Sequence, residues 1–298
     1  MNEYLNSKSV VAFIDILGFK EIVDGVEKDE ESQVLDKLKE ALYEAREKAF
    51  EIQEPMLVKI ANEEGENLKD KFKFRQFSDS VLFSFNYESE KSKDEDDLHI
   101  FACWMILFSS CYYQRIMLAN NFYVRGGISE GHTSKDDNII FSGALIKAYG
   151  LERERAIYPR IVIDEEIIEF INSKKENSPF TDLINLFYPI LLKDWNVSFI
   201  NPFGLESACS KILNHPEMND PEIRGKLDKI NTDIQNTNPD IKSDLSDDEL
   251  IKKLQSDLSE KLEEHSNNYK KYEKYLWLSE FIKWTKNEKS SLNFKYFN

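Results

Sequence analysis

The fold of this chain is decided by one stretch, Val10–Lys20, which reads VVAFIDILGFK. It is an apolar run typical of a buried β-strand, with a single carboxylate, Asp15, and a closing glycine, Gly18. Because an unpaired buried carboxylate is unfavourable, we expect a cation beside Asp15, either a metal ion or a basic side chain. The structural alternative is an Asp at a strand end that caps the following helix.

The composition is that of a folded, acidic chain. Its 298 residues leave room for one large domain or two small ones, and 41% hydrophobic and 12% aromatic residues suffice for a core. The 55 acidic residues exceed the 39 basic ones, and the net charge of −16 repels nucleic-acid backbones. We therefore expect no nucleic-acid partner, although metal ions could bring a nucleotide into such an acidic site.

The cysteines and the apolar segments indicate the compartment. Cys103, Cys111 and Cys209 form no CxxC pair, and an odd number in a long chain favours a reducing environment. The N-terminus lacks the basic start and apolar stretch of a signal peptide. The longest uncharged apolar stretch, 100–113, is shorter than the roughly 20 residues that span a bilayer, so it reads as a buried helix. These features predict a cytoplasmic protein with no membrane insertion.

Hydrophobic periodicity predicts the element order strand, helix, strand, strand, helix, strand over the first part of the chain. The predicted ranges are 10–17, 32–53, 73–77, 81–85, 98–119 and 122–129. This βαββαβ order is typical of ferredoxin-like and palm domains, an α+β class in which helices pack on one face of an antiparallel sheet. The first strand then lies beside the hairpin at the centre of the sheet.

That topology brings Asp15, late in the first strand, towards Asp79, in the Ser-Asp-Ser turn of the hairpin. Two neighbouring carboxylates repel each other unless a cation lies between them. Mg²⁺ and Mn²⁺ prefer oxygen ligands, and two such ions can support phosphoryl or nucleotidyl transfer. We therefore predict a palm-type metal site with the Ile16 carbonyl as a further ligand. Ser-Asp-Ser turns are also common without any ligand.

The rest of the chain is predicted as an extension on this domain. A β-turn at 136–138, a helix over 142–154 and a strand at 160–163 complete a domain of residues 1–165. Residues 166–298 form a C-terminal extension that packs on it, with a polar excursion at about 214–245. A capping box at 246–249 opens one long helix, predicted over about 247–285.

Two glycine-containing motifs allow a functional and a structural interpretation. Gly18-Phe19-Lys20 could hold phosphate through free backbone N–H groups, or Gly18 could be a plain turn glycine. Paired glycines after Arg125 indicate that something packs tightly against that strand. Arg125 itself either binds phosphate or forms a structural salt bridge. His132 is interpreted as an exposed loop histidine.

Several of these motifs together resemble a known family. The segments Phe13–Phe19 (FIDILGF) and Phe77–Val81 (FSDSV) resemble the two metal-binding motifs of class III nucleotidyl cyclases. Three further segments resemble the bacterial pyrimidine cyclases of Pycsar anti-phage systems: Arg125–Gly131, Gly143–Glu152 and Ala156–Ile161. The resemblance is firm over residues 10–165 and weak beyond them.

The resemblance implies a homodimer that converts UTP or CTP to the 3′,5′-cyclic monophosphate and pyrophosphate. Asp15 and Asp79 would be the catalytic residues and would hold two Mn²⁺ or Mg²⁺ ions per site. The backbone of Gly18, Phe19 and Lys20 would bind the terminal phosphates. The cyclic product would act as a second messenger in anti-phage defence and activate a separate effector.

The sequence also departs from the family. The helix Gly143–Glu152 lacks the Asn and Arg that purine cyclases carry there, and Lys147, Arg153 or Arg155 would have to supply the positive charge. Arg75 stands where adenylate cyclases have a base-reading Lys, and its partner position falls near Ile140, which accepts no hydrogen bond. These departures fit an altered base preference. They also fit the alternative, a catalytically inactive nucleotide-binding regulatory protein on the same fold.

Overall fold

The computed structural model describes residues 7–26, 32–51, 68–88, 95–134, 142–174, 184–185, 188–213 and 246–297. The first part of the chain forms β1 (Ser7–Ile16), α1 (Phe19–Val26), α2 (Ser32–Glu51), the 3₁₀ helix η1 (Leu68–Lys71), β2 (Phe72–Phe77), β3 (Ser80–Asn86), α4 (Glu95–Ala119) and β4 (Val124–Thr133). The later part forms α5 (Gly143–Glu154), β5 (Ile161–Ile163), α6 (Glu165–Lys174), η2 (Tyr188–Ile190), β6 (Leu191–Asp194), β7 (Val197–Ile200), η3 (Pro202–Gly204), α8 (Leu205–Leu213), α10 (Asp247–Glu264), α11 (Tyr269–Thr285) and β8 (Lys295–Tyr296).

The described strands form one sheet in the order β2-β3-β1-β4-β5-β7-β6-β8. β1 pairs antiparallel with both β3 and β4, so it occupies the centre of the palm-type half, as the sequence predicted. β4 and β5 are parallel, and the remaining neighbours are antiparallel. The predicted α+β class with a βαββαβ core is therefore confirmed.

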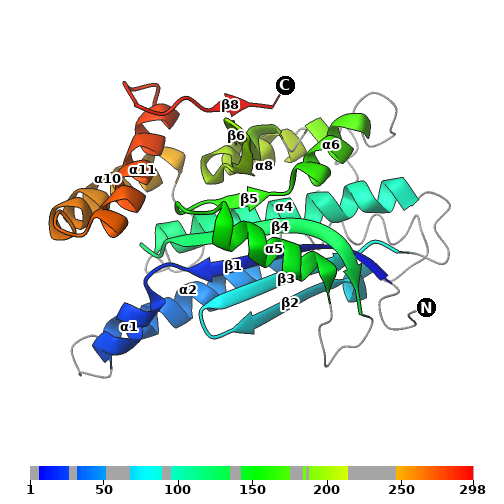
Figure 1. The fold of residues 1–298 in the computed structure, drawn as a ribbon, viewed down its shortest axis with the longest axis horizontal. Helices are drawn as coiled ribbons and strands as arrows, with labels where there is room; N and C mark the ends of the chain where they lie inside the picture. The colour runs from blue at the N-terminus through cyan, green and yellow to red at the C-terminus, as the bar shows by residue number, and fades with distance from the viewer. Residues whose placement is uncertain are drawn as a thin grey trace.

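The two helices of the βαββαβ unit, α2 and α4, pack on one face of the sheet, as the sequence predicted, and α5 covers the other face. Alternate residues of β1, such as Val10 and Ile14, are fully buried in the large core on the side of α2 and α4. On the opposite face Val11 packs with Ala144 and Ala148 of α5. Figure 1 shows α5 and α4 on opposite sides of the central strands.

α4 is the buried helix that the apolar run predicted, and its residues from Leu98 to Ala119 are buried. It packs against β1, β3, β4 and α2. No helix in the described part of the chain is both long enough and apolar enough to cross a membrane.

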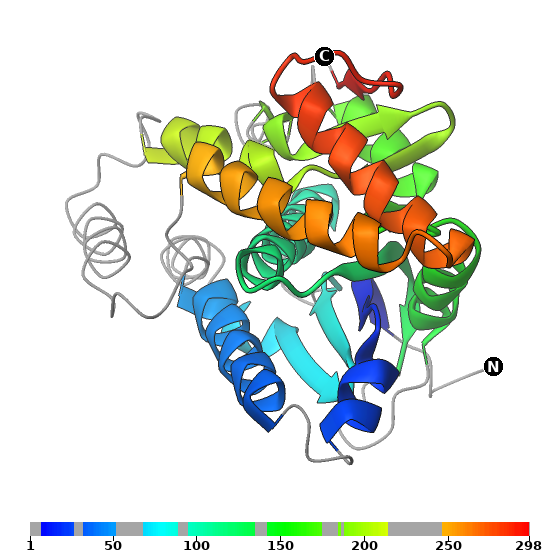
Figure 2. The ribbon, with the colours of Figure 1, turned by 90° about the vertical axis from the view of Figure 1, so that its left-hand side faces the viewer.

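The C-terminal extension continues the sheet and adds two helices. Beyond the predicted boundary at 165, β7, β6 and β8 extend the sheet on the far side of β5. The single long helix predicted over about 247–285 is wrong, because α10 ends at Glu264 and α11 begins at Tyr269, where Asn268 caps it. Figure 2 shows α10 and α11 crossing at an angle. The predicted turn at 136–138 and the excursion at 214–245 lie outside the described residues.

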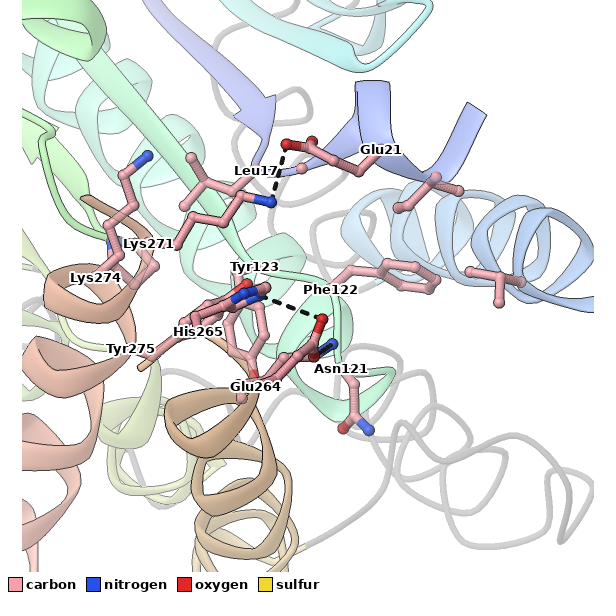
Figure 3. Close-up of a pocket in the computed structure, with 15 residues that line it drawn as sticks. Leu17, Glu21, Asn121, Phe122, Tyr123, Glu264, His265, Lys271, Lys274 and Tyr275 are labelled. Carbon is pink, nitrogen blue, oxygen red and sulfur yellow. Dashed lines mark hydrogen bonds and ion pairs between the residues drawn. The ribbon is translucent and has the colours of Figure 1, made fainter. Parts of the chain in front are cut away.

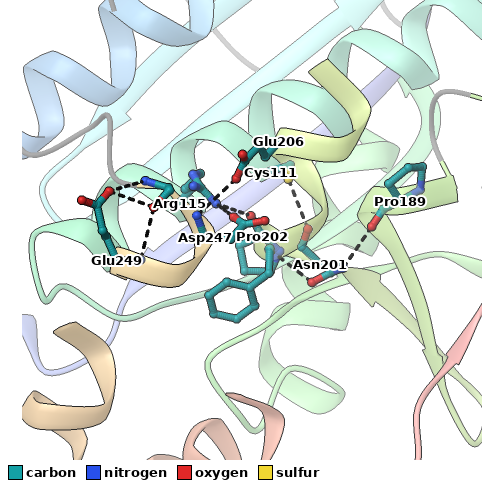
Figure 4. Close-up of polar contacts among 10 residues, drawn as sticks. Cys111, Arg115, Pro189, Asn201, Pro202, Glu206, Asp247 and Glu249 are labelled. Atoms are coloured by element: carbon teal, nitrogen blue, oxygen red, sulfur yellow. Dashed lines mark hydrogen bonds and ion pairs between the residues drawn. The ribbon is translucent and has the colours of Figure 1, made fainter. Parts of the chain in front are cut away.

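α10 is held to the core by a polar cluster at the C-terminal part of α4 (Figure 4). The buried Arg115 forms an ion pair with Asp247 and donates to the carbonyl oxygen of Pro202 at 3.2 Å. Burial raises the pKa of Asp247, and the Arg115 charge partly offsets that shift. The Asn201 amide donates to the Pro189 carbonyl at 3.0 Å and completes the cluster. The start of α10 is thereby fixed on the sheet domain.

Candidate functional site

Two carboxylates lie at the end of β1, because the β2–β3 turn reaches back to that strand. The Ile16 N–H donates to the Asp79 carbonyl oxygen at 3.1 Å, and Asp15 is paired with Ser80 in the ladder. The Ser80 hydroxyl donates to Asp15 Oδ1 at 3.1 Å. Burial raises the pKa of Asp15, the Ser80 hydrogen bond lowers it, and the neighbouring Asp79 charge raises it again. The net direction is upward, with burial as the largest cause.

Arg125 is the basic residue opposite Asp15 in the sheet, and its shortest ion pair is with Glu152. Arg125 lies opposite Asp15 on β4, and its Nη2 is 3.7 Å from Asp15 Oδ2. Its Nε is 2.6 Å from Glu152 Oε1 on α5. Burial raises the pKa of Glu152, and the Arg125 charge partly offsets that effect. Arg125 thus forms ion pairs with both Glu152 and Asp15, and Glu152 is a residue beside the site that the sequence analysis did not identify.

The oxygen atoms at this end of the sheet suit a hard divalent cation. Asp15 and Asp79 provide carboxylates, and Ile16 provides a backbone carbonyl beside them. Within the described residues no three His, Cys, Asp or Glu side chains gather into a metal-binding group. Further ligands would therefore have to be water or the oxygens of a bound substrate. The donor set fits Mg²⁺ or Mn²⁺, which commonly share their coordination with substrate phosphates.

The paired glycines of β4 have a packing role. A Cβ atom on Gly127 would lie 2.1 Å from the Ala148 carbonyl oxygen, and one on Gly126 would lie 2.6 Å from the Phe13 carbonyl oxygen. Such distances exclude any side chain without movement of the backbone. The close packing that the sequence predicted is therefore present, and α5 and β1 are the elements that approach.

The other predicted substrate-binding residues are Gly18, Phe19 and Lys20 at the start of α1 and Arg75 on β2. Gly18 has φ +81°, which suits a glycine, and it directly precedes α1. Phe19 packs against the core, and Lys20 is exposed. Arg75 shares the face of Asp15, because Arg75 pairs with Leu82 and Leu82 with Phe13, two residues before Asp15.

Two basic residues on and after α5, Lys147 and Arg155, have partners other than the Asp15 and Asp79 carboxylates. Lys147 donates to Glu166 of α6 at 2.7 Å, and this hydrogen bond raises the pKa of Lys147. Arg155 donates to the Asn196 carbonyl at 3.4 Å. The structure therefore does not bring Lys147 to Asp15 inside one protomer.

A cavity of about 400 Å³ adjoins this end of β1 (Figure 3). Its wall includes Leu17, Gly18 and Glu21 on one side, and Lys271 and Lys274 of α11 on the other. Burial lowers the pKa of Lys274, and the Arg125 charge acts in the same direction. The sequence analysis missed these lysines, because nothing in their local pattern indicates that α11 reaches the end of β1.

Comparison with known proteins finds no family model that matches this chain and no similar curated protein. Among solved structures, the chain is similar to the adenylyl cyclase CyaB from P. aeruginosa, with 19% identity, a TM-score of 0.36, and coverage of 56% of this chain and 81% of that one. It is also similar to the guanylyl cyclase domain of the RhoGC fusion protein from Blastocladiella emersonii, with 16% identity, a TM-score of 0.33, and coverage of 58% and 88%. Likenesses of this degree carry no argument about the activity of this chain.

Proposed function

We propose that this chain is a nucleotidyl cyclase that converts UTP or CTP to the 3′,5′-cyclic monophosphate and pyrophosphate. The observation that carries the proposal is the pair of carboxylates, Asp15 and Asp79, at the end of the central strands of a palm-type sheet. A non-catalytic binding module has less need of two adjacent carboxylates at such a place. The order of motifs between Phe13 and Ile161, with its resemblance to pyrimidine cyclases, supports the same conclusion.

The reaction is an intramolecular phosphoryl transfer. The ribose O3′ forms a bond to the α-phosphorus, the bond from that phosphorus to the bridging pyrophosphate oxygen breaks, and the hydroxyl proton is released to solvent. Asp15 and Asp79, with the Ile16 carbonyl, would hold two Mn²⁺ or Mg²⁺ ions per site. When bound, these ions lower the pKa of the 3′-hydroxyl and neutralise phosphate charge. The protein groups fix the position of the triphosphate relative to the ribose.

The remaining contacts concern the terminal phosphates and the base. The backbone from Gly18 to Lys20, where β1 passes into α1, would hold the terminal phosphates. Arg75 lies on the same sheet face as Asp15 and would contact the base. Its expected partner near Ile140 lies outside the described residues. An arginine at this position donates hydrogen bonds to carbonyl oxygens, which uracil, cytosine and guanine present and adenine lacks.

The active form would be a homodimer. Three large apolar side chains are exposed around the face that carries Asp15: Phe77 at the β2–β3 turn, and Ile146 and Tyr149 on α5, with exposed fractions of 51%, 73% and 48%. Tyr149 also packs edge-on against Phe13 of β1, at 5.5 Å between ring centroids. A second copy that covers this face would bury these groups and bring its own basic residues to the site.

The biological role follows from the resemblance of the motifs. The cyclic nucleotide would serve as a second messenger in bacterial anti-phage defence, and it would activate a separate effector. Deletion of the gene that encodes this chain should then abolish protection against phage. Protection that survives the Asp15→Ala substitution would contradict this role.

A second candidate is a catalytically inactive nucleotide-binding protein. The specific observation in its favour is that Lys147, a basic residue of α5, is bound to Glu166 and does not reach the carboxylates. In this case the protein would bind a nucleoside triphosphate and leave it intact. Nucleotide that is recovered unchanged from the purified protein would favour this candidate.

One experiment separates the two candidates. The purified protein is incubated with each of the four NTPs and Mn²⁺, and the products are resolved by mass. We expect cyclic UMP or cyclic CMP with equimolar pyrophosphate, and no cyclic purine nucleotide. Asp15→Ala and Asp79→Ala should abolish the product without loss of the dimer. The absence of any cyclic product from the unmodified protein would overturn the proposed cyclase.

A further inference from the structure

Lys274 is a half-buried cation for which the described residues provide neither a hydrogen bond nor an ion pair. Its neighbour Lys271 does have a partner, because its Nζ is 3.0 Å from Glu21 Oε1 (Figure 3). Asp15 and Glu21 act on Lys274 only at longer range, while Arg125 and Lys271 repel it. An ammonium group in such surroundings is stabilised by an anion that enters the cavity.

The position of Lys274 is fixed by the packing of the next helical turn. Trp277 of α11 stacks on Tyr158 with 5.3 Å between ring centroids and 4° between ring planes. The buried Arg160 lies 5.5 Å above the Trp277 ring and forms an ion pair with Asp194 at 2.9 Å. α11 therefore packs on the residues that precede β5, and the helical turn after Lys274 is held there.

The residues that line the cavity include the two that follow Asp15 and Ile16 in the sequence. Leu17 and Gly18, which line it, follow Asp15 and Ile16 directly. A nucleotide whose α-phosphate shares a bound cation with Asp15 would extend its following phosphates towards this space. The volume of about 400 Å³ lies within the roughly 300–1,000 Å³ that small-molecule sites occupy.

We propose that this cavity binds the phosphate chain of the nucleoside triphosphate, and that Lys274 of the C-terminal extension supplies, in the same protomer, positive charge that α5 does not bring to the carboxylates. The proposal rests on the proposed function for the identity of the ligand. Glu21 is then a competing anion, which holds Lys271 until the phosphates enter. The extension beyond residue 165 is accordingly part of the substrate site.

The first test measures anion binding without turnover. Inorganic tripolyphosphate is titrated into the full chain by calorimetry in a buffer free of divalent cations. Lys274→Met should weaken binding by about tenfold or more, which is the loss of one charge-assisted hydrogen bond. Lys274→Arg should retain most of the affinity. The matched control is Lys270→Met, since Lys270 is exposed on the same helix outside the cavity and should leave binding unchanged.

A second variant keeps the proposal testable if Lys274→Met fails to fold. Glu21→Gln removes the competing carboxylate and should tighten tripolyphosphate binding, with a stronger effect at low ionic strength. Equal binding by the unmodified protein, Lys274→Met and Glu21→Gln would overturn the proposal, even if the protein forms a cyclic nucleotide. If Lys274 governs tripolyphosphate binding while no NTP yields a cyclic product, the anion site stands and the cyclase function fails.

Discussion

Two carboxylates on adjacent central strands, Asp15 on β1 and Glu130 on β4, are buried to a similar degree and differ in how their charge is balanced. Their side chains are 21% and 18% exposed. Burial raises the pKa of both groups, but the net direction is upward for Asp15 and downward for Glu130, because His99 and Tyr87 donate to Glu130. The charge of Glu130 is therefore balanced by its partners within the protein. Asp15 is the carboxylate that we propose binds a metal ion.

The partners of Glu130 are themselves fixed by packing. The His99 ring is stacked between Tyr87 and Phe170, with centroid distances of 4.1 and 3.8 Å, and its Nε2 forms an ion pair with Glu130. Among the described residues, the Ser80 hydroxyl donates to Asp15 and the Arg125 guanidinium lies 3.7 Å from it, while the neighbouring Asp79 carboxylate raises its pKa. Since both groups belong to the same sheet, the difference arises from the partners and not from burial.

The largest predicted effect concerns activity. Asp15→Asn or Asp79→Asn should lower cyclic nucleotide formation by at least about a hundredfold, because the site loses a ligand for the cation that stabilises the transferring phosphate. The thermal midpoint should not fall, because Asn keeps the size of the side chain and removes repulsion between the two carboxylates. Product formation by mass and unfolding by calorimetry check this pair of outcomes. A large drop in the thermal midpoint would show that Asp15 is a structural group.

The matched substitution at Glu130 should have the opposite profile. Glu130→Gln removes the ion pair with His99, and we expect a loss of about 1–2 kcal/mol in the free energy of unfolding. Cyclic nucleotide formation should be unchanged at a temperature where the variant is folded. Urea unfolding gives the first quantity and product analysis the second. A strong loss of activity in the folded variant would remove the distinction between the two carboxylates.

Divalent cations without nucleotide should have a smaller effect, which is a change in the thermal midpoint of unfolding. Mn²⁺ should raise the thermal midpoint of the unmodified protein and of Glu130→Gln, because a ligand that binds only the folded state stabilises it. The same addition should leave Asp15→Asn unaffected. A shift of equal size in all three proteins would place the cation elsewhere.

The smallest effect is a dependence of stability on pH. The pKa of Glu130 is below its ordinary value of 4.5 in the folded protein, so its contribution to stability is fully present above pH 4.5. This contribution is lost as the pH falls through the lowered pKa. The difference in unfolding free energy between the unmodified protein and Glu130→Gln should therefore shrink as the pH falls below 4.5. A difference that grows on acidification would contradict the lowered pKa.

Sequence reasoning located Asp15 and Asp79 because both lie in local patterns, a strand end and a tight turn, whose pairing follows from the strand order. It did not find the Arg125–Glu152 pair, because a buried Glu on a helix has the same spacing as an exposed one. The break between α10 and α11 was also missed. The apolar positions Leu262 and Tyr269 are seven residues apart, so the helical spacing of apolar residues continues across the break between α10 and α11.

The contribution of Lys274 depends on how α11 packs against the residues that precede β5. That docking relies on the contacts of Trp277 with Tyr158 and Arg160, which are distant in the sequence. Periodicity predicts that α11 has an apolar face, but it does not predict which surface covers that face. The sequence therefore predicted the two carboxylates at the end of β1, and it did not predict that Lys274 lines the neighbouring cavity.

The central claim is that Asp15 belongs to a cation site of a pyrimidine nucleotide cyclase and that Glu130 does not. The most direct test gives an equimolar mixture of the four NTPs and Mn²⁺ to the unmodified protein, Asp15→Asn and Glu130→Gln, and resolves the products by mass. We predict cyclic UMP or cyclic CMP from the unmodified protein and Glu130→Gln, and none from Asp15→Asn. Undiminished product from Asp15→Asn, or no cyclic product from the unmodified protein, would contradict this account.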